Sequence, residues 1–350
     1  MPQLPKLSYV LLSHNREKYI RAAIESAFAQ DYEGELEYIF SDDCSTDRTF
    51  EIIKECVAAY KGNRRVVVTQ PPTNLRTAGN FNHALSFVQS DWIVRADDDD
   101  LSVVDRCTVI GKVINAVPGC TYIATEASKY FTDNEEQAAV AESRTPCGTF
   151  MHPRVVDIRE ASPDECAYHA KTYSYKAWSM EAYRAFGELP LDAYWADDYI
   201  FYFRTAVLGK GVLVDNAVAV LIRNGSGNQS RGDDDNARDY RAIIRLEQFN
   251  DKYYNLTYAP MLATYNQLKD YVEEHFSAQE KEAAAPFMAD FAINMEHRDH
   301  LRSYWRKGTL NRLKICREMG YPAAFTMLYC LPMPIYAGLL SIIRKLKGKS

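Results

Sequence analysis

The sequence lacks the short motifs that mark many nucleotide-binding and metal-binding proteins. It contains neither G-x-G-x-x-G nor a complete G-x-x-x-x-G-K-[ST] P-loop, so we expect no glycine-rich backbone cradle for phosphate. Its eight cysteines include no Cys-x-x-Cys pair, which argues against a zinc site or a disulfide framework and favours reduced, cytosolic thiols. The net charge of −6 gives no reason to expect nucleic acid as a partner.

The sequence also shows no internal repeat and no export signal. Residues 1–13 contain too short an apolar run for a signal peptide and no small-residue cleavage site. We therefore expect a cytoplasmic protein. The 350 residues exceed one average domain, which favours one large α/β unit with a smaller appendage.

Apolar runs and helical patterns alternate along the first hundred residues. Short apolar runs predict buried strands at residues 7–13, 36–41, 66–68 and 92–96. Apolar residues at helical spacing predict amphipathic helices at residues 19–28, 50–60 and 78–88. This order predicts an α/β fold with a doubly wound, mostly parallel sheet.

Polar clusters follow three of the predicted strands, at residues 13–16, 42–47 and 97–100. In doubly wound sheets, ligands bind beyond the carboxyl ends of the strands. We therefore expect these clusters to meet in one crevice.

The last of these clusters consists of four consecutive aspartates, Asp97 to Asp100. Adjacent carboxylates repel one another, so a bound cation would stabilise their ionised form. A strand that ends in Asp-x-Asp offers oxygen ligands to Mg²⁺ or Mn²⁺, which can in turn hold a diphosphate. A solvated acidic loop is the alternative for the run taken alone. Because no glycine-rich phosphate loop is present, a diphosphate would need a metal here.

The rest of the chain divides by composition near residue 233. Before it, we expect helices at residues 103–117 and 200–208, strands at 120–125, 212–214 and 217–222, and a polar loop at 133–147. After it, helical patterns with charged faces occupy residues 240–254, 261–276, 279–302 and 310–319. The sequence therefore predicts a catalytic domain at residues 1–232 and a C-terminal helical region at residues 233–350. Such charged helices are usually packing or oligomerisation elements, so a homo-oligomer is an expectation.

The C-terminal segment has an unusual composition. Residues 323–343 carry no charge, contain Pro332 and Pro334, and precede a basic stretch at 344–349. Two prolines argue against one straight spanning helix. Two interpretations stay open: a broken hairpin or interfacial helix whose basic residues contact anionic lipid, or an apolar helix docked on the protein's own core or in a dimer.

The clusters, taken in order, resemble family 2 glycosyltransferases of the GT-A fold. The resemblance rests on residues 10–20, 23–30, 42–49, 74–85 and 91–93 together with the aspartate run, and it extends over about residues 7–230. Each motif is weak alone, whereas their joint order is specific.

This resemblance implies a nucleotide-sugar site. Its residues would be Ser13, Asn15, Arg16, Asp42, Asp43, Asn80, Asp97, Asp98 and Arg223. Asp42 would accept a hydrogen bond from the nucleotide base, and Arg223 would contact phosphate unless it is an ordinary surface arginine. Asp97 and Asp99 match the family's Asp-x-Asp and would bind Mg²⁺ or Mn²⁺, with Asp99 as the direct ligand. Asp100 would orient the donor sugar.

The resemblance also implies a catalytic base. Asp197 and Asp198 stand where the family carries Glu-Asp before a tyrosine-rich helix and an arginine, here Arg204. Asp198 would be the base, and the alternative is an acid that complements the helix dipole. The sequence departs from the family where Arg76 replaces the glycine of Asn-x-Gly, and where Asn224 replaces a histidine after Arg223.

The implied function is transfer of a hexosyl or deoxyhexosyl group from a nucleotide diphosphate donor, most simply a UDP-sugar, with inversion. The acceptor would be a hydroxyl of a glycan or a lipid-linked glycan in bacterial surface polysaccharide synthesis, at the cytoplasmic face of the inner membrane. One alternative is a sugar-1-phosphate nucleotidyltransferase, although that class opens with a glycine-rich basic loop that this sequence lacks. Another is a catalytically silent scaffold, against which the acids at the metal and base positions argue.

Overall fold

The structure is a computed structural model, and its residues group into two units. It describes residues 3–125, 129–147, 153–160, 176–191, 197–214, 217–224, 260–301 and 330–347, together with single residues at 313, 317 and 327. The first unit comprises Met1–Gly225 and Thr264–Ala289, and the second comprises Ser226–Ala263 and Asp290–Ser350. The first unit contains all of the residues predicted to form the site.

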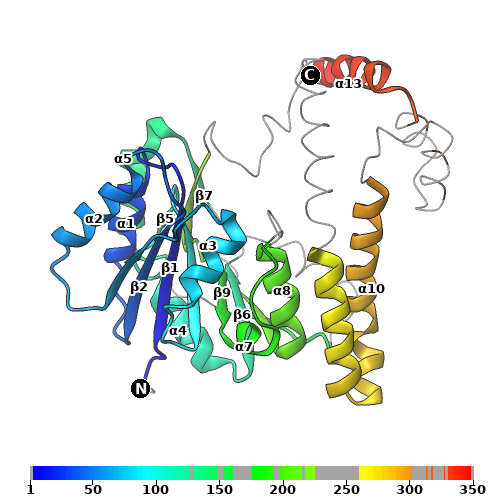
Figure 1. Cartoon of the computed structure of the whole chain (residues 1–350), viewed down its shortest axis with the longest axis horizontal. Helices are drawn as coiled ribbons and strands as arrows, with labels where there is room; N and C mark the ends of the chain where they lie inside the picture. The colour runs from blue at the N-terminus through cyan, green and yellow to red at the C-terminus, as the bar shows by residue number, and fades with distance from the viewer. Residues whose placement is uncertain are drawn as a thin grey trace. The chain divides into compact units, whose positions relative to one another are not determined.

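An eight-stranded sheet forms the centre of the first unit (Figure 1), with the strand order β3-β2-β1-β4-β9-β6-β10-β8. In chain order its strands are β1 (Leu7–Ser13), β2 (Leu36–Asp42), β3 (Val66–Thr69), β4 (Trp92–Asp97), β6 (Cys120–Thr125), β8 (Arg154–Val156), β9 (Lys176–Ser179) and β10 (Lys210–Val214). β9 runs antiparallel to β4 and β6, and β8 runs antiparallel to β10, whereas the other pairs are parallel. The predicted α/β fold with a mostly parallel sheet is confirmed.

The strand register brings three polar ends together. Ser13 at the end of β1 pairs with Asp42 at the end of β2, and Leu12 pairs with Asp97 at the end of β4. Because these parallel strands end at paired positions, the segments that follow them emerge at the same edge of the sheet. The predicted meeting of these clusters follows directly from this register.

Helices cover both faces of the sheet. On one face lie α1 (Ile20–Phe28), α2 (Thr49–Ala59) and α4 (Arg106–Ala116), whose buried apolar residues join the strands in one core. On the other face, Phe81 of α3 (Arg76–Leu85) and Phe201 of α8 (Asp197–Leu208) pack around Trp178 of β9. Trp178 is completely buried at the centre of this group of rings.

A second, small sheet has the order β5-β11-β7. It consists of β5 (Leu101–Ser102), β7 (Lys129–Phe131) and β11 (Val220–Arg223). After β7 the chain forms a 3₁₀ turn, η1 (Asp133–Glu135), and then α5 (Glu136–Ser143), so the predicted loop at residues 133–147 was wrong. The physical reason is a capping box between Thr132 and Glu135, followed by good helix formers in a sequence whose polarity alone suggested a loop.

Two predicted C-terminal helices are confirmed. Residues 260–275 are helical, and α10 spans Ala278–Leu301. Within the first unit, Gln267 donates a 2.9 Å hydrogen bond to the carbonyl of Phe186 in α7 (Glu181–Phe186), and Phe287 is buried against Phe203. The predicted helix at residues 240–254 lies outside the described residues, as does most of 310–319. The domain boundary predicted from composition stays a prediction.

In the second unit, α13 (Met333–Lys347) forms the last described helix. It begins beside Pro332 and has Pro334 in its first turn, where proline is tolerated because the missing N–H would be unpaired anyway. One face carries exposed apolar side chains at Ile335, Leu339, Ile342 and Ile343. In the part of the chain that the structure describes, no helix combines the length and the apolarity needed to cross a membrane.

Candidate functional site

The loop after β1 is fastened to the aspartate run. The backbone N–H of His14 donates a 2.9 Å hydrogen bond to Oδ2 of Asp98. The Nε atom of Arg16 lies 3.4 Å from Oδ1 of Asp98 and 3.7 Å from Oδ2 of Asp99. The structure therefore brings together Arg16, Asp98 and Asp99, which the sequence had placed in one site.

Asn15 fastens the same loop to the loop after β2. Its φ of +54° is left-handed, a conformation that asparagine adopts more readily than most residues. Its N–H donates to Ser45 Oγ at 2.8 Å, and its Oδ1 accepts a 2.8 Å bond from the N–H of Thr46. Beside it, Ser13 is buried, and its Oγ has no hydrogen-bond partner among the described residues.

Asp42 is completely buried at the end of β2. One carboxylate oxygen accepts bonds from the N–H of Ser45 at 2.9 Å and from Gln70 Nε2 at 2.7 Å, and the other accepts from Ser45 Oγ at 2.5 Å. Three donors fix its orientation. They join the end of β2 to Ser45 of the following loop and to Gln70, the residue after β3.

Asp43 turns toward the start of α3. Its Oδ1 accepts a 2.7 Å hydrogen bond from the N–H of Leu75. Burial raises the pKa of Asp43, against the opposing effects of the Leu75 N–H and of His14. The side chain therefore joins the second loop to the segment at residues 74–76.

Asn80 does not lie among the acids but beneath the end of β2. Its Nδ2 donates to the carbonyl of Ser41 at 3.1 Å, and its Oδ1 accepts from Ser41 Oγ at 2.5 Å. It is 2% exposed, and both ends of its amide contact Ser41. Asn80 therefore supports the end of β2, which carries Asp42.

Burial shapes the electrostatics of the aspartate run. The pKa of Asp98 is raised to about 8 by burial and by the neighbouring charge of Asp99, and Arg16 opposes this shift. The pKa of Asp99 is also raised, by burial and by Asp97. Asp97 is the most accessible of the three, with a side chain 47% exposed and 3.5 Å from Arg95. This is a set of carboxylates whose ionisation an added cation would favour.

The donor set fits a metal that also binds substrate. Among the described residues, no group of three or more His, Cys, Asp or Glu side chains is gathered to hold a metal ion alone. Mg²⁺ and Mn²⁺ are commonly held by one or two carboxylates with substrate phosphates completing the coordination. Asp97 and Asp99 supply such hard oxygen ligands, so the residues present fit a cation shared with a diphosphate.

Arg223 lies in the interior and not on a ligand surface. It is 1% exposed and ends β11. Its N–H donates to Asp100 Oδ1 at 2.7 Å, and its Nε donates to the carbonyl of Asp99 at 3.1 Å. The next residue, Asn224, donates its N–H to the carbonyl of Phe131. Arg223 is therefore neither an ordinary surface arginine nor visibly directed at a phosphate.

Two acids beside Arg223 were missed in the sequence. Arg223 NH1 donates to Asp133 Oδ1 at 2.9 Å, and NH2 lies 2.9 Å from Glu136 Oε2. Both acids belong to the segment that was expected to be a loop. The capping box Thr132-x-x-Glu135 was the signal that could have placed them at the start of a helix.

The predicted base belongs to α8. Asp197 and Asp198 form the first turn of α8, but their side chains lie outside the described residues. Arg204, one turn and a half later, is buried and donates to the carbonyl of Gly187 at 2.9 Å. Burial lowers the pKa of Arg204 to about 10. The roles assigned to Asp198 and its neighbours stay predictions.

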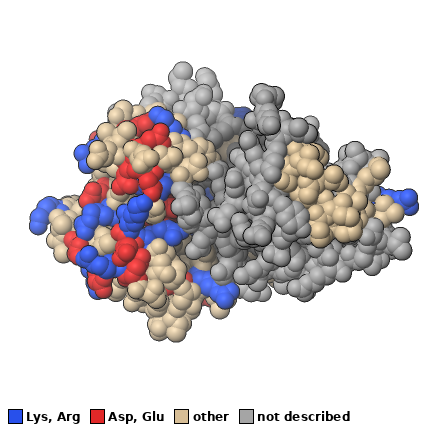
Figure 2. Space-filling view, turned by 90° about the horizontal axis from the view of Figure 1, so that it is seen from above, with Lys and Arg blue, Asp and Glu red and all other residues tan. Residues whose placement is uncertain are grey.

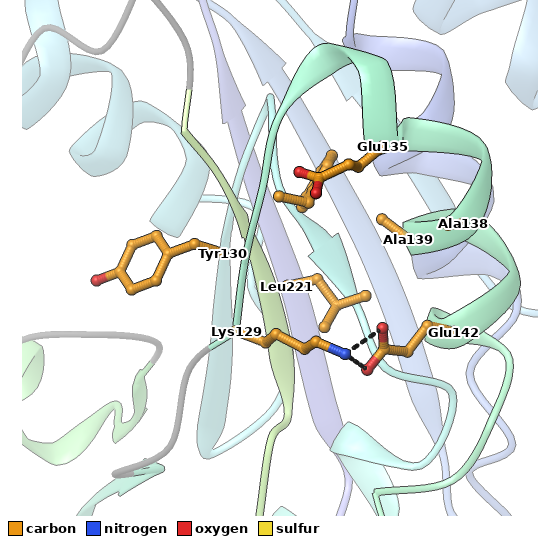
Figure 3. Close-up of a pocket in the computed structure, with 8 residues that line it drawn as sticks. Lys129, Tyr130, Glu135, Ala138, Ala139, Glu142 and Leu221 are labelled. Atoms are coloured by element: carbon orange, nitrogen blue, oxygen red, sulfur yellow. Dashed lines mark hydrogen bonds and ion pairs between the residues drawn. The ribbon is translucent and has the colours of Figure 1, made fainter.

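A separate pocket opens between β7 and α5 (Figure 3). It encloses about 170 Å³ and is lined by Lys129, Tyr130, Phe131, Glu135, Ala138, Ala139, Glu142 and Leu221. Lys129 and Glu142 pair across one end of it, and Tyr130 points away from α5. None of the predicted site residues lines this pocket, so it is distinct from the candidate site.

The described surface at the carboxyl edge of the sheet carries both signs of charge. β1 runs upward in Figure 1, and Figure 2 looks down on the molecule from that side. Acidic and basic side chains lie next to one another there over the described part of the first unit. This mixture agrees with the pairing of Arg16 with the aspartates.

The arrangement of strands and helices is a GT-A fold. The structure aligns with Staphylococcus aureus TarS residues 1–349 in complex with UDP at a TM-score of 0.55 and 15% sequence identity, covering 97% of this chain and 88% of that one. At this identity the likeness shows the fold alone. Residues 8–146 match the family model described as glycosyl transferase family 2.

Curated relatives match the same part of the chain. The putative glycosyltransferase EpsE of Bacillus subtilis is 41% identical over 102 residues, which is 29% of this chain and 36% of EpsE. The poly(ribitol-phosphate) β-N-acetylglucosaminyltransferase TarS of Staphylococcus aureus is 33% identical over 97 residues, which is 27% of this chain and 16% of TarS. The chain thus spans well under half of the length of these two relatives.

Proposed function

We propose that this protein is a metal-dependent, inverting glycosyltransferase that uses a nucleotide diphosphate sugar. The observation that carries the proposal is the meeting of Asp42, Arg16 and the aspartate run at one edge of the sheet. A nucleotide diphosphate needs one acid that accepts a hydrogen bond from its base. It also needs a pair of acids that bind the cation at its diphosphate. The fold shared with TarS bound to UDP makes a UDP-sugar the donor to test first.

The chain's own residues divide the work of donor binding. Asp42, held by three donors, accepts a hydrogen bond from the base, and the left-handed Asn15 shapes the loop around the nucleoside. Asp97 and Asp99 hold the cation, and Arg16 balances the charge of Asp98. When bound, the cation supplies Lewis-acid stabilisation of the departing diphosphate.

Asp198 completes the proposed reaction. As general base it takes the proton from the acceptor hydroxyl while that oxygen attacks the anomeric carbon and the bond to the diphosphate breaks. One displacement of this kind inverts the configuration. The position of Asp198 in the first turn of α8, before the buried Arg204, supports this role by its order in the family motif.

We further propose a glycan or lipid-linked glycan acceptor at the cytoplasmic face of a membrane. TarS, whose name describes transfer of N-acetylglucosamine to poly(ribitol-phosphate), supports a surface-polymer acceptor. The apolar stripe Ile335, Leu339, Ile342 and Ile343 of α13 precedes the basic residues 344–349, a pattern that suits an anionic lipid surface.

A ligand-stability screen tests the proposal. The melting temperature of the full chain is measured with UDP-, GDP- and dTDP-sugars, each with Mn²⁺ or with EDTA. A ligand that binds only the folded state raises the apparent stability, so one nucleotide class should raise the melting temperature in Mn²⁺ and much less in EDTA. No shift with any nucleotide sugar, or pyrophosphate release from a nucleoside triphosphate and a sugar phosphate, would reject it.

A further inference from the structure

The guanidinium of Arg223 lies among three oxygen atoms and two aromatic rings. Its three nitrogens lie at the Asp99 carbonyl (3.1 Å), Asp133 (2.9 Å) and Glu136 (2.9 Å). Its planar faces lie against the rings of Tyr19, at 4.3 Å from the ring centroid, and Phe131, at 4.6 Å. Cation–π contacts of this kind strengthen when the charge is desolvated, as it is here.

Arg223 and its partner Asp133 contact two parts of the candidate site, the segment after β1 and the aspartate run. Asp133 also pairs with Lys18 and accepts a 3.2 Å hydrogen bond from the hydroxyl of Tyr19, and both residues follow directly on the loop that carries Arg16. The Arg223 backbone N–H holds the Asp100 carboxylate, and its side chain holds the Asp99 carbonyl. Arg223 therefore holds the backbone of the aspartate run at Asp99 and the carboxylate of Asp100, and its charge also acts on the Asp99 carboxylate.

Helix α5 supplies one of the two acids that pair with Arg223. Its first residue, Glu136, pairs with Arg223, and its seventh, Glu142, pairs with Lys129 of β7 at 2.7 Å, as Figure 3 shows. In the first pair the side chain of Arg223 is 1% exposed and that of Glu136 is 33% exposed. In the second pair Lys129 and Glu142 are 58% and 42% exposed. Exposed ion pairs contribute little to stability, so the two glutamates of one helix form a matched pair for experiment.

A lysine could not replace this arginine. Arg223 is 1% exposed, whereas Asp133 and Glu136 are 38% and 33% exposed, so removing either acid leaves the buried guanidinium charge less compensated. The flat, forked guanidinium can stack between two rings and bond three separate oxygens at once, whereas a lysine ammonium is a point charge on a flexible stem. The geometry at Arg223 uses the features that lysine lacks.

We propose that Arg223, with Asp133 and Glu136, is a positioning residue that fixes the backbone of the aspartate run for cation binding. This inference rests on the proposed glycosyltransferase function and deepens it. Groups that orient metal ligands from behind typically change metal affinity about 10- to 100-fold when they are mutated. Arg223 thus acts through Asp99 and Asp100 and does not touch the donor.

The test is a thermodynamic cycle on the full chain. The dissociation constant of UDP is measured calorimetrically in EDTA and in saturating Mn²⁺, and the ratio of the two constants gives the enhancement by the cation. It is compared among wild type, Arg223→Lys, Glu136→Gln, Glu142→Gln and Asp99→Asn. Melting temperatures in EDTA report general loss of stability separately.

We expect Arg223→Lys to reduce the enhancement about 10-fold or more while leaving UDP affinity in EDTA unchanged. Glu136→Gln should reduce it in the same direction by a smaller factor, and Glu142→Gln should leave it within about twofold of wild type. If Arg223→Lys does not fold, the two glutamine variants decide the question, since a positioning role requires them to differ.

Two results would overturn the inference without touching the proposed function. The first is a wild-type enhancement in Arg223→Lys and Glu136→Gln while Asp99→Asn has lost it. The second is a loss of UDP affinity in EDTA for Arg223→Lys, which would make Arg223 a direct ligand contact. A wild-type protein whose UDP affinity ignores Mn²⁺ would instead reject the metal-dependent function itself.

Discussion

The Nε atom of Arg16 lies 3.4 Å from Oδ1 of Asp98, although the two residues are far apart in the sequence. Their strands, β1 and β4, are parallel neighbours, and the pairing of Leu12 with Asp97 brings their ends level. A cation from the chain itself thus lies beside the buried carboxylates. This placement reduces the repulsion within the aspartate run while leaving the more exposed Asp97 accessible.

The role of Asp198 can be separated from donor binding by kinetics. Asp198→Asn should lower kcat by about 10²- to 10⁴-fold because general-base assistance is lost, while the dissociation constant of UDP stays unchanged. Asp197→Asn, one position earlier in the same turn of α8, is the control and should lower kcat far less. A kcat for Asp198→Asn close to that of wild type would remove it from the mechanism.

Asp43 should give the protein a pH-dependent stability. An unfolded aspartate loses its proton near pH 3.8, whereas burial raises the pKa of Asp43 in the folded state. Between the two pKa values the folded state binds more protons, so the free energy of unfolding falls as pH rises through that interval. Urea unfolding between pH 3.5 and about 7 should show this decline in wild type and a weaker one in Asp43→Asn. Parallel curves for the two proteins would contradict the assignment.

Arg76 occupies a backbone conformation that favours glycine. Its φ is +63°, at the position where the family motif has a glycine. A left-handed conformation costs a residue with a Cβ about 1–2 kcal/mol. Arg76→Gly should therefore be more stable than Arg76→Ala by about 1 kcal/mol in urea unfolding, since both variants lose the same side chain beyond Cβ. An alanine variant as stable as the glycine variant would show that the strain is absent.

The apolar stripe of α13 predicts binding to anionic vesicles. The triple variant Ile335→Ser, Leu339→Ser and Ile342→Ser should reduce sedimentation with phosphatidylglycerol vesicles by more than about tenfold, because each buried CH₂ contributes about 0.8 kcal/mol. Met327→Ser, at an exposed apolar residue outside α13, is the control. Equal binding of all three proteins, or binding to neutral phosphatidylcholine alone, would contradict an anionic lipid partner.

The arrangement of the acids could be predicted because it depends on strand order and register. Alternating apolar runs and amphipathic helices fix a parallel sheet, and parallel strands must end on one edge. Ser13, Asp42 and Asp97 therefore meet as expected. Short-range patterns suffice for such a site, since each acid follows its own strand.

The surroundings of Arg223 could not be predicted in the same way. Its burial depends on Asp133 and Glu136, about ninety residues earlier, and on a helix whose polar sequence suggested a loop. The support that Asn80 gives to Ser41 is equally invisible, because a buried amide and a ligand-binding amide look alike in sequence. Tertiary contacts between polar groups leave no periodic signal.

The most direct test of the central claim is donor turnover by wild type and Asp99→Asn. UDP release from a UDP-sugar is followed with Mn²⁺, with EDTA, and with Mn²⁺ restored after EDTA. We expect release by wild type only when the cation is present, and a loss of about 10²-fold or more in Asp99→Asn with its fold intact by circular dichroism. Release that is equal in EDTA, or equal in Asp99→Asn, would contradict a cation-dependent site at the aspartate run.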